Sequence, residues 1–80
     1  MTQPSQPAQT SDIGYAKAKS IALNHAGVNE STVYDMEVEP DYEYGVPVYE
    51  VSFKSDGMEY DYDIHAATGE IIKHEAEWDD

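Results

Sequence analysis

The sequence predicts an α+β fold, in which one N-terminal helix packs on a three- to four-stranded antiparallel meander sheet. Two observations lead to this prediction. Alanine and isoleucine recur at three- and four-residue spacing between Gly14 and Ala26, which is typical of an amphipathic helix. After Thr32, apolar and charged residues instead alternate one by one, which is typical of strands that have one face in water.

The predicted helix begins at Gly14, its N-cap, and ends at Ala26. Gly27 follows, and we expect it to end the helix in the left-handed conformation, which glycine adopts without strain. Asp12 precedes the helix N-terminus, where a negative charge is favourable. Because Ala18 and Ala22 are small, this side of the helix should lie close to a sheet whose own side chains are large.

The first strand is predicted from Val33 to Glu39, where residues alternate between apolar and acidic. Residues Pro40 to Pro47 contain a glycine between two prolines, so we expect a longer hairpin loop with Tyr42 and Tyr44 exposed or folded back. The loop should return the chain antiparallel to the first strand.

The next two strands flank Asp56-Gly57, a dipeptide that favours a tight hairpin turn. In the stretch YEVSFKSDGMEYDYDIHAATGEI, Tyr49 to Ile71, the alternation continues on both sides of this turn. Residues 66–69 should then turn again. The segment from Glu70 to Trp78 keeps no single period, so it is expected to be either a short last strand or a tail laid against the sheet.

The alternation divides the sheet into two faces. The face under the helix is expected to hold Tyr34, Met36, Val38, Tyr49, Val51, Phe53, Tyr60, Tyr62 and Ile64. The other face is expected to collect Asp35, Glu37, Glu39, Glu50, Glu59, Asp61 and Asp63, relieved mainly by Lys54 and His65. Such a face must be wet, and added salt should stabilise the fold by screening its self-repulsion.

The chain has 17 Asp and Glu against four Lys and Arg, a formal charge of -13, which disfavours nucleic acids and anionic lipid surfaces as partners. Its apolar runs are far shorter than the ~20 residues that a membrane span needs, so we expect no insertion of this segment into a membrane. Acidic edge strands favour a monomer.

The chain is expected to have two parts. Residues 1–11, MTQPSQPAQTS, are rich in Pro, Gln, Ser and Thr and should form a flexible tether. Residues 12–80 should form the folded domain, which has no disulfide because the sequence contains no cysteine.

Motifs for catalysis or metal binding are weak in this sequence. His25, His65 and His74 stand in no arrangement typical of a transition-metal site. Asp61 and Asp63 lie inside a predicted strand, with no glycine turn to gather further calcium ligands. The composition excludes a thiol nucleophile, and the serines lie on predicted surfaces and turns. We therefore predict no catalytic, cofactor-binding or metal-binding residue, and no enzyme activity.

Several stretches resemble a PepSY domain: AKSIALNHAGV from Ala18 to Val28, YEV-x-F, DG-x-EYDYDI and A-x-TGEI. The resemblance covers nearly everything after the first dozen residues. PepSY domains occur in propeptides of thermolysin-family metallopeptidases and in bacterial cell-envelope proteins. The resemblance thus implies an extracellular or cell-envelope location, with lipid anchoring through a segment not present here as one form of it.

The resemblance implies a non-catalytic binding module that binds a peptidase and inhibits or regulates it, the partner being a secreted metallopeptidase or a cell-wall lytic enzyme. We expect the segment after the TGEI turn to provide the contacts, together with two exposed tyrosines: Glu70, Ile71, Ile72, Lys73, His74, Trp78, Tyr42 and Tyr44. The alternative is a structural or scaffolding module of a cell-envelope lipoprotein with no peptidase contact.

Overall fold

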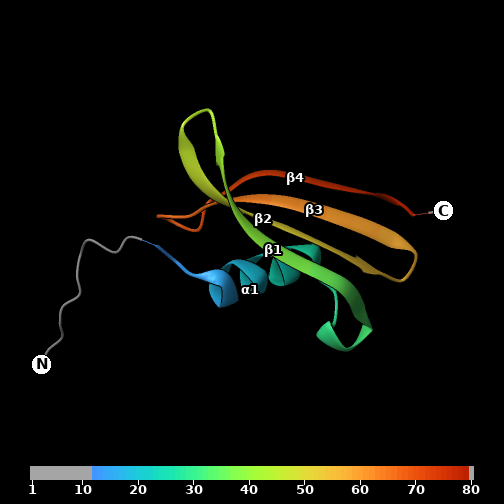
Figure 1. Cartoon of the computed structure of the whole chain (residues 1–80). Coiled ribbons are helices and arrows are strands. Elements are labelled where there is room, and N and C mark those ends of the chain that lie inside the picture. Colours follow the sequence, from blue (N-terminus) through green and yellow to red (C-terminus); the bar gives the residue numbers. More distant parts are fainter. Residues whose placement is uncertain (1–11, 80) are drawn as a thin grey trace, which may run out of the picture.

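The computed structural model describes residues 12–79, and the tether predicted for residues 1–11 lies outside this range. One helix lies against an antiparallel four-stranded sheet of order β1-β2-β3-β4, which confirms the predicted α+β class (Figure 1). The segment after Glu70 is a strand rather than a tail. The elements are α1 (Tyr15–Ala26), a short 3-10 helix η1 (Glu30–Thr32), β1 (Val33–Glu43), β2 (Val46–Ser55), β3 (Met58–His65) and β4 (Ile71–Trp78).

Both ends of α1 are as predicted. Gly14 is the N-cap and has a positive φ of 86°, and the Asp12 carboxylate accepts a hydrogen bond from its N–H at 2.8 Å. Gly27 has a φ of 72° and donates its N–H to the carbonyls of Leu23 and Asn24, which ends the helix in the left-handed conformation.

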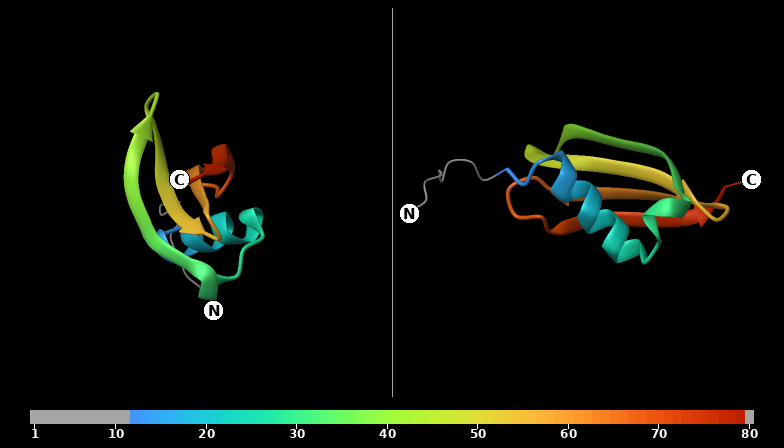
Figure 2. Two further views of the ribbon diagram at one scale, coloured as in Figure 1. Left: turned by 90° about the vertical axis from the view of Figure 1, so that its right-hand side faces the viewer. Right: turned by 90° about the horizontal axis from the view of Figure 1, so that it is seen from below.

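The core lies between α1 and the middle of the sheet, with the helix crossing one face of the sheet (Figure 2). Ala18 and Ala22 are fully buried and meet alternate residues of β2 and β3, whose aromatic rings fill the space that the alanines leave. The buried cluster consists of Ala18, Ala22, Leu23, Tyr49, Val51, Phe53, Tyr62, Ile64 and Ala66. It contains most of the predicted core residues of the two central strands, while Tyr60 is partly buried against it.

The segment before α1 is tied to the sheet. The Tyr49 hydroxyl donates a 2.5 Å hydrogen bond to the Asp12 carboxylate, and this bond raises the pKa of Tyr49 to about 12. The Ile13 N–H donates to the carbonyl of Ala66 at 2.8 Å. These two bonds fix the start of the helix over the β3–β4 turn.

The prediction of a long loop from Pro40 to Pro47 is wrong. Here β1 continues to Glu43 and β2 begins at Val46, so only Tyr44 and Gly45 form the turn. Both have positive φ angles, 55° and 81°, which is the geometry of a two-residue turn that matches the twist of the strands. Pro40 pairs with Tyr49. Counting back from Glu43, every second residue of β1 directs its backbone N–H and C=O groups to β2, and Pro40 is not one of these residues. Its nitrogen therefore points away from β2 and needs no hydrogen-bond partner.

The prediction that Tyr34 lies in the core is also wrong. The β1–β2 register shifts between Tyr34 and Glu37, where Asp35 has a φ of 55°. This bulge inserts one residue and reverses the alternation, so Tyr34 lies beside Lys54 on the wet face and is 49% exposed. Met36 and Val38 remain on the helix side.

We predict that Ala22→Leu lowers the free energy of unfolding by about 1 to 3 kcal/mol, because the fully buried Ala22 leaves no space for three further carbon atoms. Urea unfolding followed by circular dichroism measures the change. Ala16→Leu is the matched control, since Ala16 lies on the exposed side of the same helix. Equal stability of the two variants would contradict the assignment of the packed face.

Candidate functional site

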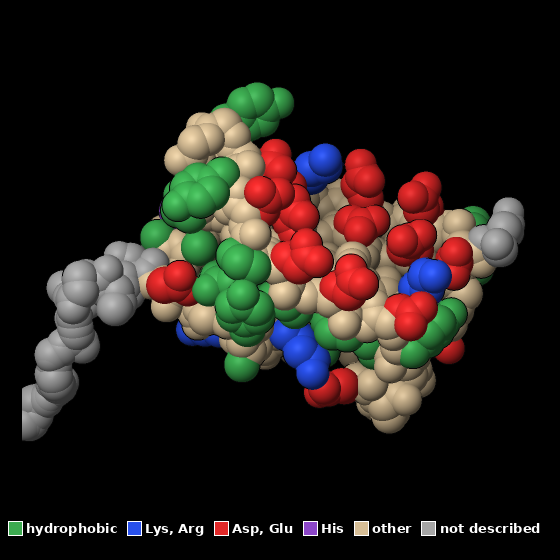
Figure 3. All heavy atoms as spheres, in the orientation of Figure 1, with side chains coloured by type: hydrophobic (Ala, Val, Ile, Leu, Met, Phe, Trp, Pro, Cys, Tyr) green, Lys and Arg blue, Asp and Glu red, His purple; other side chains and the backbone are tan. Residues whose placement is uncertain are grey.

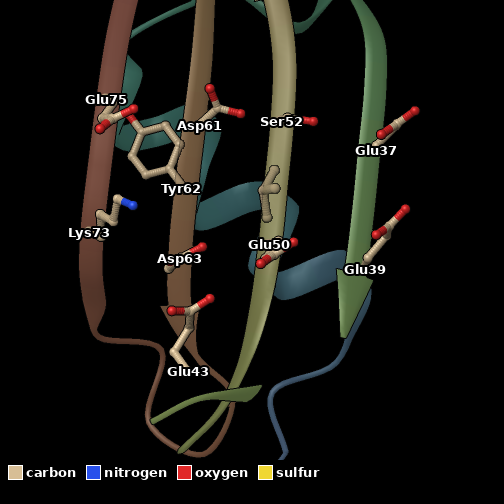
Figure 4. Close-up of a pocket in the computed structure, with 11 residues that line it drawn as sticks. Glu37, Glu39, Glu43, Glu50, Ser52, Asp61, Tyr62, Asp63, Lys73 and Glu75 are labelled. Atoms are coloured by element: carbon tan, nitrogen blue, oxygen red, sulfur yellow. The ribbon is translucent and has the colours of Figure 1, made fainter. Parts of the chain in front are cut away.

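The face of the sheet opposite α1 carries a hollow that we call the acidic groove. Its volume is about 290 Å³, and side chains from all four strands line it (Figure 4). Figure 3 shows the concentration of carboxylates over the sheet. The charged residues that line the groove are Glu37, Glu39, Glu43, Glu50, Asp61, Asp63, Glu75 and Lys73. Most of the predicted acidic positions therefore do share one surface.

Three carboxylates meet at one end of the acidic groove. Asp41, Glu43 and Glu50 each place an oxygen within 4.8 Å of the others. A hydrogen bond with the Asp41 side chain, then burial and the nearby charges of Asp41, Asp63 and Glu43, raise the pKa of Glu50 to about 7. The backbone N–H of Tyr42 and the bond with Glu50 lower the pKa of Asp41. Below about pH 7, Glu50 therefore holds a proton, and Asp41 is the charged partner in their hydrogen bond.

The neighbouring Asp63 belongs to the same electrostatic unit. Burial raises its pKa, and the charge of Glu43 adds to the effect, while Lys73 opposes it. The oxygens of Asp41, Glu43 and Glu50 could surround a cation, but calcium takes six to eight oxygen ligands, more than this group supplies with one oxygen each. The proton on Glu50 already relieves part of the repulsion between these carboxylates.

Sequence reasoning missed this cluster because it placed Asp41 and Glu43 in a long loop. The dipeptide Tyr44-Gly45, if taken as a two-residue turn, would have set the register that pairs Glu39 with Glu50 and Asp41 with Val48. Asp41 and Glu50 then follow as diagonal neighbours across the two strands.

The second candidate surface is the outer edge of β4. The Asp79 N–H donates to the Gly57 carbonyl at 2.9 Å, and the same register pairs Glu75 with Asp61 and Glu77 with Glu59. Alternate residues of an antiparallel strand direct their backbone groups to opposite sides. The residues that point their N–H and C=O groups away from β3 are therefore His74, Ala76 and Trp78, which follow the register shift at Ile72.

The two edges of the sheet differ. On β1, Pro40 has no N–H to offer where the free edge would need one, and the bulge at Asp35 bends the strand. On β4, the outward backbone groups are free of proline, and Ile72 and Trp78 are 47% and 75% exposed. An added strand would therefore find a usable edge at β4 rather than at β1.

The structure separates the predicted contact residues into four places. Ile71 is partly buried against the core, and Glu70 lies in the turn, where its carbonyl accepts the His65 N–H at 2.7 Å. Lys73 lines the acidic groove. Ile72, His74 and Trp78 lie along β4, whereas Tyr42 and Tyr44 belong to the β1–β2 hairpin at the other edge of the sheet.

We predict that Glu50→Gln stabilises the domain at pH 8 but not at pH 4.5. Glu50 binds its proton more tightly in the folded than in the unfolded chain, so its contribution to stability is complete below its ordinary pKa of 4.5 and is lost as the pH rises through about 7. A glutamine keeps a neutral hydrogen-bonding group at every pH. Melting temperatures at pH 4.5 and 8 measure the effect.

The matched control for this variant is Glu77→Gln, which removes the same charge from the exposed strand β4, where Glu77 pairs with Glu59 rather than with Asp41. If both variants changed the melting temperature alike at the two pH values, Glu50 would not be the group that holds the proton.

Comparison with known proteins identifies a family for this chain. The family model of the peptidase propeptide and YPEB domain, PepSY, matches residues 12–75. An uncharacterized protein of Streptococcus pyogenes serotype M6, Spy1430, is 38% identical over 73 residues, which cover 91% of this chain. The chain spans 56% of the length of that relative.

No solved structure is significantly similar to this chain. The family model nevertheless covers α1, β1, β2, β3 and the greater part of β4, and it begins at Asp12, where the described fold begins. The match thus includes the whole helix and the central hairpin from which the fold is built, and the chain belongs to the PepSY family.

Proposed function

We propose that this domain is a non-catalytic, secreted or envelope-anchored module that binds a peptidase and restrains it. The proposed partner is a secreted metallopeptidase or a cell-wall lytic enzyme. The observation that carries the proposal is the open edge of β4, where exposed apolar side chains lie beside backbone N–H and C=O groups that point away from β3. The family supplies the class of partner, and the edge supplies the surface.

Family membership supports the regulatory part of the proposal. PepSY domains are generally non-catalytic propeptide or regulatory modules, and they occur in secreted or envelope proteins. Between residues 12 and 79, the structure contains no helix with the length and apolar character needed to cross a membrane.

Strand addition is the physical basis of the proposed contact. A partner with an extended segment would form main-chain hydrogen bonds with His74, Ala76 and Trp78, and these bonds provide affinity for any sequence. The side chains of β4 add specificity, because its two faces differ. Ala76 and Trp78 offer apolar surface on the helix side, whereas Glu75 and Glu77 lie on the acidic side.

The charge of the domain selects among partners. An added strand that alternates apolar and basic residues would match both faces of β4, and the net charge of -13 would speed its approach at low salt. Two copies of β4 would instead bring their own acidic residues together, so we propose that the free domain is a monomer.

The alternative is a scaffolding module of a cell-envelope lipoprotein without peptidase contact. The hairpin tip favours it, because Tyr42 and Tyr44 are 71% and 102% exposed and offer aromatic surface to a wall polymer. Loss of retention on intact peptidoglycan after replacement of both tyrosines by alanine, with peptidase binding absent, would favour this function.

We predict that Ala76→Pro weakens binding to the cognate peptidase about tenfold or more, because proline removes an outward N–H from the centre of the free edge. The pairing of β4 with β3 uses the neighbouring residues, so the fold should persist. Binding to a panel of secreted metallopeptidases and cell-wall lytic enzymes is measured by surface plasmon resonance, together with their turnover.

Ala76→Ser is the matched control, since it changes the side chain at the same position but keeps the N–H. It should bind like the parent domain. No complex with any peptidase of the panel would count against the proposed function, and equal binding by the proline and serine variants would move the contact away from the β4 edge.

A further inference from the structure

Two histidines from distant parts of the chain meet beside the core. His25 lies in the last turn of α1, and His74 lies on β4, on the helix side of the sheet. Their ring centroids are 4.6 Å apart, and the ring planes are tilted by 55°. Both residues are exposed, so solvent and ions reach them.

This separation fits two imidazoles that bind one metal ion in adjacent positions. With a metal–nitrogen bond of about 2.0 to 2.1 Å, each ring centre lies about 3.2 Å from the ion, and an angle of about 90 to 110° at the ion then places the two centres about 4.5 to 5.2 Å apart. The observed 4.6 Å lies within this interval.

The side chain of Tyr62 contacts both histidines. The hydroxyl of Tyr62 lies 3.0 Å from Nδ1 of His25, and the Tyr62 ring stacks on His74 with centroids 5.8 Å apart. Histidines that bind metals usually donate their other ring N–H to a fixed partner, which sets the tautomer. In the tautomer of His25 whose Nδ1–H donates to the Tyr62 hydroxyl, Nε2 carries the lone pair that a metal needs.

The electrostatic setting also favours a cation. His25 lies at the C-terminal end of α1, where the helix dipole is negative, and the chain has a net charge of -13. Nitrogen ligands select zinc, copper or nickel rather than calcium or magnesium, which prefer oxygen.

We propose that His25 and His74 together bind one divalent transition-metal ion, with water in its remaining positions. The site is separate from the acidic groove, since it lies on the opposite face of the sheet, and it does not depend on the proposed peptidase. Two protein ligands make it weaker than a structural zinc site with four.

Titration of the untagged full chain with zinc chloride tests the proposal by isothermal calorimetry. We expect one ion per chain, and about a tenfold or greater loss of affinity in His74→Ala and in His25→Ala. His65→Ala is the matched control and should bind like the parent chain, because His65 lies at the β3–β4 turn, where its Nδ1 accepts the Ala67 N–H at 3.1 Å. Excess calcium should not displace the zinc.

Nuclear magnetic resonance of the parent chain gives a second readout that needs no variant. Zinc should shift the imidazole signals of His25 and His74 and leave those of His65 in place. Equal affinity of the His65 and His74 variants, displacement by calcium, or the lack of a stoichiometric site would overturn the proposal. Because no peptidase is present, these results leave the proposed function to its own test.

Discussion

The packing of a small-residue helix face on the two central strands is the constraint on which the rest of this structure depends. Ala18 and Ala22 have no exposed surface, and they let α1 lie close to the aromatic residues of β2 and β3. A single helix covers only part of one face of four strands. The other face and both edges must therefore be compatible with water.

The wet face is compatible with water because it carries carboxylates, but so many carboxylates repel one another. Lys54 relieves one end of the face, with its amine 3.7 Å from Asp35 and 3.5 Å from Asp79. At the other end, where Asp41, Glu43 and Glu50 converge, the hydrogen bond with Asp41 raises the pKa of Glu50 to about 7, and protonation of Glu50 lessens the repulsion. The acidic groove is thus a consequence of a sheet face that no helix covers.

The two edge strands differ in the backbone groups that they expose, so only one edge of the sheet suits an added strand. A bulge and Pro40 close the edge of β1, whereas β4 keeps its outward backbone groups. The end of α1 also reaches the helix side of β4, where His25 contacts His74. Partner binding and metal binding are both proposed on this strand because it is the part of the sheet that the helix leaves least covered.

The amino-acid sequence by itself determined the elements whose signals are local. Helical spacing with a glycine at each end defined α1, and Asp56-Gly57 between two alternating runs defined the central hairpin, because three- to four-residue and two-residue periods follow directly from backbone geometry. The acidic face followed from the same alternation.

Tertiary structure alone decided the remainder. The bulge that turns Tyr34 outward depends on how β1 pairs with β2, and the register shift that leaves Ile72 as an extra residue in β4 explains why the last segment shows no single period. The candidate sites depend most on the tertiary structure. Asp41 meets Glu50 across a hairpin, and His25 meets His74 only when the helix packs on the sheet. Contacts between elements are set by register and packing, which local residue patterns do not encode.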